Sequence, residues 1–310
     1  MEKVLPLEHD LKASLAAFRR ELQRFLTGKE AMADTVVASL ISGGHVLLED
    51  VPGVGKTTFI KALAQYLGLA MKRVQFTSDL LPSDIIGAQI YDQEEKVFTF
   101  HEGPIFTNIL LADELNRASP KTQSALLEAM GERAVTVDRK TRKLPAPFFV
   151  VAAQNPSDHM GTFPIPESQL DRFAIKIKLD YPSAEKELQI FSQALLNPLS
   201  QIEEGILMKD QLVRIQIAVD QIHVSNEVGK CVQAVVDRSR DHSQIQLGIS
   251  TRGGVQWVRL AKGIALLEGR EYVTPDDLIA VAEHCLMHRM IFHNGQTELV
   301  LQDLLQSMDI

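Results

Sequence analysis

The stretch from His45 to Thr58, HVLLEDVPGVGKTT, limits what the chain can fold into more than any other. An apolar run typical of a buried strand leads into a turn rich in proline and glycine, and a helical pattern begins at Lys56. A strand, a glycine-rich turn and a helix form the context of a phosphate-binding P-loop. Glycines let backbone N–H groups surround phosphate oxygens, and the helix N-terminus adds unpaired N–H groups and its positive dipole end. The sequence therefore predicts a nucleotide phosphate site made by seven residues: Pro52, Gly53, Val54, Gly55, Lys56, Thr57 and Thr58.

Two side chains of this loop have defined tasks in the P-loop motif. Lys56 would reach the β- and γ-phosphates, and Thr57 would supply a hydroxyl ligand to Mg²⁺. The motif G-x-x-x-x-G-K-[ST] has glycine at position 50, where this chain has Asp50. Because aspartate tolerates unusual turn dihedrals better than most residues, we expect the turn to form with that carboxylate directed away from the phosphates.

A second apolar run, residues 109–112, ends in Asp113 and Glu114. We expect this strand to place both carboxylates at the C-terminal edge of a sheet, beside the P-loop. Asp113 would hold Mg²⁺ through its water shell, and Glu114 would polarise the attacking water as a general base. A strand that ends in a solvated acidic turn has the same pattern, but the P-loop upstream favours the functional interpretation.

Strand patterns alternate with helical patterns in the first part of the chain, and the expected strands are 46–48, 72–76, 109–112, 148–153 and 174–179. Continuous apolar strands that alternate with helices indicate an α/β fold with a parallel sheet covered on both faces. Two β-hairpins are also expected. The first pairs 86–91 with 96–101, and the second begins with strand 134–137 and has a charged tip at 138–143.

The composition changes at Tyr181-Pro182-Ser183, after which helical patterns dominate. We therefore expect an α/β nucleotide-binding domain at 1–182, which carries both hairpins, and an all-helical domain at 183–310. In the second domain Trp257 lies among apolar residues at helical spacing, which predicts a core position.

Charge and cysteine content restrict partners and compartment. The net charge of −8 argues against a protein that wraps nucleic acid by neutralising its phosphates. Cys231 and Cys285 are too few for a disulfide framework, which favours a reducing compartment. The N-terminus lacks the apolar segment of a signal peptide, and no apolar stretch is long enough to span a bilayer. We therefore expect a cytoplasmic protein.

Three further polar residues are candidates, although an ordinary structural role explains each of them better when it is taken alone. Asn155, at the end of strand 148–153, could orient a water or contact the γ-phosphate, although asparagine before proline is also typical of a turn. Arg172 and Arg252 are single arginines that a surface ion pair would explain. From the residues alone, neither arginine acquires a role.

His284 and His288 are spaced i, i+4 on a predicted helix, with Cys285 between them. This spacing is that of half a metal site. Because no further ligand pair occurs nearby, we expect these residues to have a structural or surface role.

Five segments in a fixed order resemble the MoxR-type AAA+ ATPases: EDVPGVGKT, FHEGPIFTNILLADELNRASPKTQSALLEAMGER, PFFVVAAQNP, GTFPIPESQLDRF and GISTRGG. The resemblance that they mark covers nearly the whole chain in the right order, and the long second segment is highly specific. That family also has counterparts of Asp50, so the missing glycine is compatible with the resemblance.

The resemblance implies a ring-forming ATPase, usually hexameric, that binds ATP and Mg²⁺ between subunits. It assigns Lys56 and Thr57 to Walker A, and Asp113 and Glu114 to Walker B. Asn155 matches sensor 1, Arg172 the arginine finger that acts on the neighbouring subunit's ATP, and Arg252 sensor 2 in the helical lid. It also implies the sheet order 5-1-4-3-2, and it identifies the hairpins as the helix-2 and pre-sensor-1 inserts.

The implied function is chaperone-like remodelling or maturation of a separate protein, since the family is associated with partners that carry von Willebrand A-type domains. Three alternatives remain open at this point. The chain could be a motor subunit similar to that of magnesium chelatase, or a nucleic-acid translocase, which its acidity disfavours. It could also be a nucleotide-dependent assembly scaffold with little turnover, against which Asp113, Glu114 and Arg172 argue.

Overall fold

The computed structural model describes residues 8–26, 29–50, 56–154, 161–179, 202, 204–293 and 297–308. The chain divides into two compact units. The sheet unit comprises Leu47–Arg172 and Lys178–Lys209, and the helical unit comprises Met1–Val46, Phe173–Ile177 and Asp210–Ile310. The N-terminal helices thus group with the C-terminal ones. The expected boundary between residues 182 and 183 lies outside the described residues and stays a prediction.

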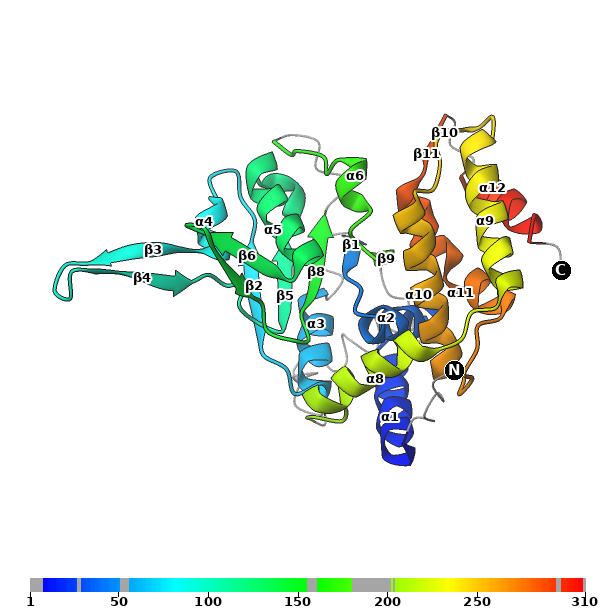
Figure 1. Cartoon of the computed structure of the whole chain (residues 1–310), viewed down its shortest axis with the longest axis horizontal. Coiled ribbons are helices and arrows are strands. Elements are labelled where there is room, and N and C mark those ends of the chain that lie inside the picture. The colour runs from blue at the N-terminus through cyan, green and yellow to red at the C-terminus, as the bar shows by residue number, and fades with distance from the viewer. Residues whose placement is uncertain are drawn as a thin grey trace, which may run out of the picture. The chain divides into compact units, whose positions relative to one another are not determined.

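A parallel sheet carries the fold (Figure 1), and its five strands are β1 (Val46–Asp50), β2 (Met71–Gln75), β5 (Ile109–Asp113), β8 (Phe149–Gln154) and β9 (Ile175–Leu179). Their spatial order is β2-β5-β8-β1-β9, which confirms the expected order 5-1-4-3-2 read from the other edge. β5 runs parallel to both β2 and β8, and all of its residues are buried. This burial explains why the strand reads as an uninterrupted apolar run.

Among the residues that the structure describes, the helices of the sheet unit are α3 (Lys56–Tyr66), α4 (Pro82–Ile86), η1 (Leu115–Arg117), α5 (Pro120–Glu132) and α6 (Glu167–Leu170). α5 begins as its sequence predicts. The Ser119 side chain accepts a hydrogen bond from the Thr122 N–H, and Pro120 occupies the first turn, where its missing N–H has no cost.

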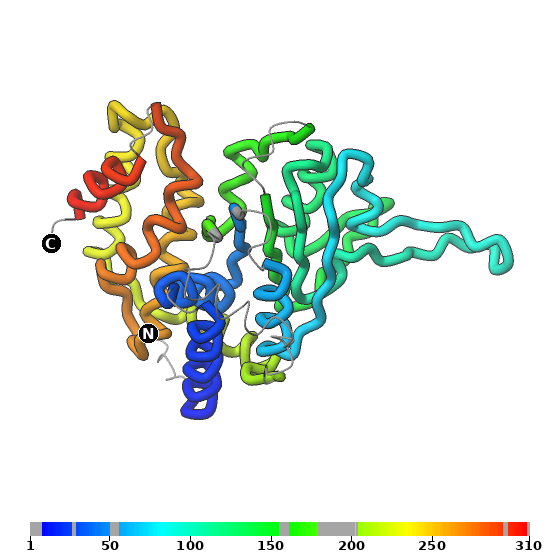
Figure 2. The backbone as a smooth tube through the Cα atoms, turned by 180° about the vertical axis from the view of Figure 1, so that it is seen from behind, coloured from blue at the N-terminus to red at the C-terminus, as the bar shows by residue number. Residues whose placement is uncertain are grey.

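The first hairpin, β3 (Gly87–Asp92) with β4 (Val97–Glu102), is antiparallel as expected and extends away from the rest of the sheet unit (Figures 1 and 2). The second hairpin pairs β6 (Ala134–Val137) with β7 (Lys140–Lys143).

The expected charged tip of the second hairpin at 138–143 is wrong. Asp138 and Arg139 alone form the turn, with φ of 50° and 65°, and the next four residues are the second strand. Two consecutive positive φ angles suit the right-handed twist of the paired strands. Arg142 is therefore a strand residue, and its guanidinium lies 3.7 Å from the centre of the Phe100 ring on β4.

The helical unit contains α1 (His9–Phe25), α2 (Glu30–Ile41), α8 (Lys209–Gln221, whose first residue belongs to the sheet unit), α9 (Asn226–Asp241), α10 (Thr251–Leu267), α11 (Pro275–Leu286), η2 (Met287–Arg289) and α12 (Thr297–Gln306). α10 packs against α2 and α11. Trp257 of α10 is fully buried, and its indole N–H donates to the Leu278 carbonyl over 2.8 Å, which confirms the predicted core position.

Two short antiparallel strands, β10 (Ile245–Leu247) and β11 (Ile291–Phe292), were not expected.

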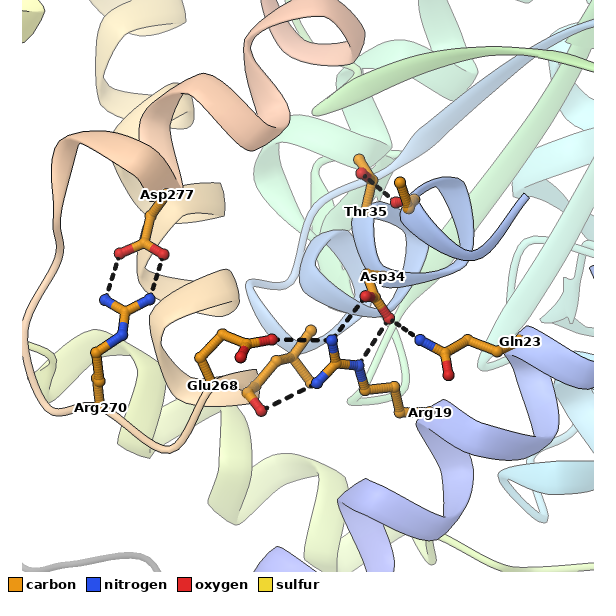
Figure 3. Close-up of polar contacts among 9 residues, drawn as sticks. Arg19, Gln23, Asp34, Thr35, Glu268, Arg270 and Asp277 are labelled. Carbon is orange, nitrogen blue, oxygen red and sulfur yellow. Dashed lines mark hydrogen bonds and ion pairs between the residues drawn. The ribbon is translucent and has the colours of Figure 1, made fainter. Parts of the chain in front are cut away.

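A polar network joins the N-terminal helices to the end of α10 (Figure 3). The Arg19 guanidinium donates to both Asp34 oxygens, over 2.8 and 2.7 Å, and to Glu268 over 2.9 Å. Gln23 donates to the same Asp34 carboxylate. A second pair, Arg270 with Asp277, ties the loop before α11 to its first turn, at 2.5 and 2.7 Å.

Candidate active site

Asp113, the last residue of β5, lies between two cations. Its Oδ1 is 2.7 Å from Lys56 Nζ, at the start of α3, and its Oδ2 is 2.6 Å from Arg73 Nη2, on the neighbouring strand β2. The carboxylate is 3% exposed. The structure thus brings together Lys56 and Asp113, the residues that the sequence assigned to phosphate and Mg²⁺. It adds Arg73, which sequence reasoning missed.

Burial by itself raises the pKa of the Asp113 carboxyl. The hydrogen bonds and positive charges of Lys56 and Arg73 outweigh this effect and hold its pKa below the usual value. An ionised carboxylate is the oxygen ligand that Mg²⁺ prefers, and Thr57 offers a hydroxyl in the adjacent turn of α3. The described donors therefore fit a magnesium ion.

Glu114 follows directly and adopts the left-handed conformation, with φ 55° and ψ 44°. A non-glycine residue in this region costs about 1–3 kcal/mol, and such strain is concentrated at functional sites. The Glu114 carboxylate is 31% exposed and pairs with Arg117, whose Nε lies 2.9 Å from Oε2. Glu114 thus presents a partly exposed carboxylate at the C-terminal end of β5, next to Asp113.

The neighbouring strands β8 and β1 also end in polar side chains. Gln154, the last residue of β8, donates from Nε2 to Glu49 Oε1 of β1 over 3.3 Å. Asn155 and the loop residues Pro52–Gly55 lie outside the described residues, so their assigned roles stay predictions. Thr58 lies half-buried in the first turn of α3.

Arg172 follows α6, and its side chain contacts another helix of the same subunit. Its Nη1 donates to the Leu127 carbonyl of α5 over 2.6 Å. Its Nε is buried and has no hydrogen-bond partner among the described residues. Gln169 of α6 also contacts α5, through Ser124 Oγ at 3.2 Å, so the turn that carries Arg172 is docked on α5.

Comparison with known proteins matches the ATPase family associated with various cellular activities (AAA) to residues 45–175, and the AAA lid domain to residues 237–307. Chaperone MoxR1 of Mycobacterium tuberculosis is 40% identical, over 87% of this chain and 74% of its own. YeaC of Bacillus subtilis is 42% identical, over 98% of this chain and 97% of its own. The chain belongs to the MoxR family of AAA+ ATPases.

A crystal structure of a protein from Cytophaga hutchinsonii is 35% identical to this MoxR-family chain and superposes with a TM-score of 0.85, over 96% of this chain and 97% of the other. The fold is therefore shared with a solved structure. None of the helices that the structure describes is long and apolar enough to span a membrane.

Arg252, the expected sensor 2 of this MoxR-family protein, lies in the first turn of α10 and is exposed. Ser250 caps that turn by accepting a hydrogen bond from the Gly253 N–H over 2.9 Å. The cap fixes where the helix begins and therefore the position on the helix from which the Arg252 side chain projects. Its contact with nucleotide stays a prediction.

The expected helical pair His284 and His288 does not share one α-helix. α11 ends at Leu286, and His288 lies in the 3-10 helix η2. Among the residues that the structure describes, no group of three or more His, Cys, Asp or Glu side chains could hold a metal ion. His288 is buried instead against the Phe173 carbonyl, with Nε2 3.1 Å from the oxygen.

Burial, reinforced by the positive charges of Arg289 and Lys176, holds the pKa of His288 well below its usual value of 6.5. The folded protein keeps this imidazole neutral, while the unfolded chain takes up a proton near pH 6.5. Stability should therefore be complete above that pH and fall as the pH is lowered, by up to about 1.4 kcal/mol per pH unit from this one group.

Urea unfolding measured between pH 7.5 and 5 tests this expectation. Replacing His288 by glutamine should make the acid loss of stability shallower, whereas replacing the exposed His101 should leave the slope unchanged. An unchanged slope in His288→Gln would show that His288 is not buried in its neutral form.

Proposed function

We propose that this protein hydrolyses ATP to ADP and phosphate with Mg²⁺, as a ring in which each site is completed by a neighbouring subunit. The observation that carries the proposal is the buried Asp113 carboxylate, bound by Lys56 at the C-terminal edge of a parallel sheet. That edge is where open α/β sheets bind ligands. Membership of the MoxR family supports the same reaction.

In this proposal the backbone N–H groups of the loop and Lys56 bind the triphosphate, and Thr57 and Asp113 hold the metal ion. Bound Mg²⁺ neutralises negative charge on the β- and γ-phosphates. With the ion bound, Lys56 and Arg73 would each keep only part of their present contact with Asp113.

Glu114 accepts the proton of the attacking water. To do so its carboxylate turns from Arg117, which contacts it at 2.9 Å. Asn155 orients the same water, and Arg252 reaches the γ-phosphate from the lid. Arg172 extends into the site of the next subunit, where it stabilises the charge that develops on the equatorial oxygens of the γ-phosphate.

The energy of hydrolysis would serve a separate protein. A relative that is 40% identical is named a chaperone, which supports remodelling or maturation of a partner. We propose a partner with a von Willebrand A-type domain and a hexameric ring. Cys231 and Cys285, both in the described part of the chain, form no disulfide, which suits a reducing, cytoplasmic setting.

Replacing Lys56 by alanine tests the site. We expect ATP affinity to fall about 10–100-fold, because a charge-assisted hydrogen bond to phosphate contributes about 1.5–3 kcal/mol. Lys61→Ala, an exposed position on the same helix, is the matched control and should bind ATP like the wild type. Titration with a fluorescent ATP analogue measures both. Unchanged affinity in Lys56→Ala would refute the P-loop assignment.

A further inference from the structure

A buried guanidinium lies where α11 passes into η2. Arg289 is 5% exposed. Its Nη2 donates to the Phe173 carbonyl over 2.6 Å, and its Nη1 donates to the Ala174 carbonyl over 3.2 Å. Nη1 also contacts the Cys285 carbonyl and lies 2.9 Å from His288 Nε2. This cluster includes Cys285 and His288, two of the three residues in the histidine and cysteine pattern that the sequence left without a function.

The bonds from Arg289 hold the backbone directly after Arg172. Phe173 and Ala174 follow Arg172 in the chain, and their carbonyls are two successive acceptors for one planar guanidinium. A rigid fork that binds two consecutive carbonyls fixes the orientation of the peptide between them, which a single flexible ammonium cannot do. The C-terminal side of the Arg172 backbone is thereby anchored to the end of α11.

The same side chain packs against the turn that carries Arg252. A Cβ placed on Gly253 would lie 2.9 Å from Arg289 Cδ and 3.3 Å from its Nε. Any larger residue at 253 would therefore displace Arg289. Because Gly253 directly follows Arg252, the aliphatic part of Arg289 lies under the first turn of α10 while its guanidinium holds Phe173.

We propose that Arg289 is a positioning residue for Arg172: it holds the backbone directly after Arg172, while its own side chain rests against the first turn of α10. It acts through Arg172 and contacts no substrate. This inference rests on the proposed function, in which Arg172 serves the neighbouring subunit's ATP. A shift of the first turn of α10 would move Arg289 and, with it, the backbone that follows Arg172.

Two substitutions test the role. In Arg289→Lys the charge stays but the fork is lost, and in Arg289→Gln both are lost. We expect ATP affinity to stay within about 2-fold, since the P-loop is unaltered, and turnover to fall about 10–100-fold, because a misplacement near 1 Å costs up to 10²-fold. The control is Arg270→Gln, which breaks the ion pair at the other end of α11 and should lower the melting temperature without changing turnover below it.

A double-mutant cycle separates positioning from general destabilisation. If Arg289 acts through Arg172, adding Arg289→Gln to Arg172→Ala should reduce turnover no further than Arg172→Ala alone. Multiplied losses would show that Arg289 acts elsewhere and overturn the proposal. Unfolding of both Arg289 variants at the assay temperature would make the residue a fold requirement only and would also overturn it.

Subunit mixing tests the direction of the effect. Arg289→Gln subunits mixed with equal Glu114→Gln subunits should regain turnover, because the second kind donates an intact Arg172 to the intact site of the first. Mixing Arg172→Ala with Glu114→Gln is the control and should recover in the same way. Recovery in the control alone overturns the Arg289 proposal, whereas failure of the control refutes the proposed trans arginine itself.

Discussion

Replacing Arg172 by alanine is expected to lower ATP turnover by ~10³-fold or more while leaving ATP affinity nearly intact, as is typical of arginine fingers. In the proposed mechanism the transition state concentrates charge on the equatorial oxygens of the γ-phosphate, and the Arg172 guanidinium of the neighbouring subunit would stabilise that charge. Steady-state hydrolysis and a nucleotide titration, both at ring-forming concentration, measure the two quantities.

Arg172→Ala also removes a hydrogen bond to the Leu127 carbonyl. This loss should cost about 1 kcal/mol, well below the stability of a folded domain, so the variant stays folded. Arg20→Ala, at an exposed position of α1, is the control for losing an arginine and should keep full turnover. Wild-type turnover in Arg172→Ala would discard the finger assignment.

Replacing Glu114 by glutamine is expected to reduce hydrolysis by ~10²–10⁴-fold and to leave ATP bound. Glutamine keeps the size and the hydrogen-bonding oxygen of glutamate but cannot take up the proton of the attacking water. Single-turnover experiments with labelled ATP, followed by separation and identification of the bound nucleotide, distinguish ATP that stays intact from ADP that is released slowly.

Glu128→Gln on α5 is the matched control, because it removes one exposed carboxylate from the same unit and should change nothing. Ordinary product release from Glu114→Gln would remove Glu114 as the base. If ATP stays bound, the same variant loaded with ATP becomes the bait for the partner protein, since a trapped state keeps a client engaged.

Much of the fold could be predicted from local sequence signals. The apolar run 109–112 predicts β5, because a strand buried on both faces has no polar alternation. Ser119 and Pro120 predict the start of α5, because a cap and a first-turn proline act within a few residues of each other. The sheet order, by contrast, came from the resemblance to a family, since spacing along the chain does not state which strands are neighbours.

Where local patterns failed, competing geometry explains the error. The charged run 138–143 looked like a solvated tip, but two residues with positive φ close the turn, and the pairing Val137 with Lys140 draws the rest into a strand. His284 and His288 have helical spacing, yet the chain tightens into η2 after Leu286. The charge and spacing of residues along the chain do not determine which hydrogen bonds the backbone makes.

By itself the sequence determined the strand, P-loop and helix order, the acidic pair at the end of β5, and the family, because each depends on residues that are neighbours in the chain. Only the tertiary structure decided which side chains meet. Asp113 and Arg73 are 40 residues apart, and Arg289 and Phe173 are 116 apart. Contacts at such separations depend on how the elements pack, and no periodicity within a single element encodes that packing.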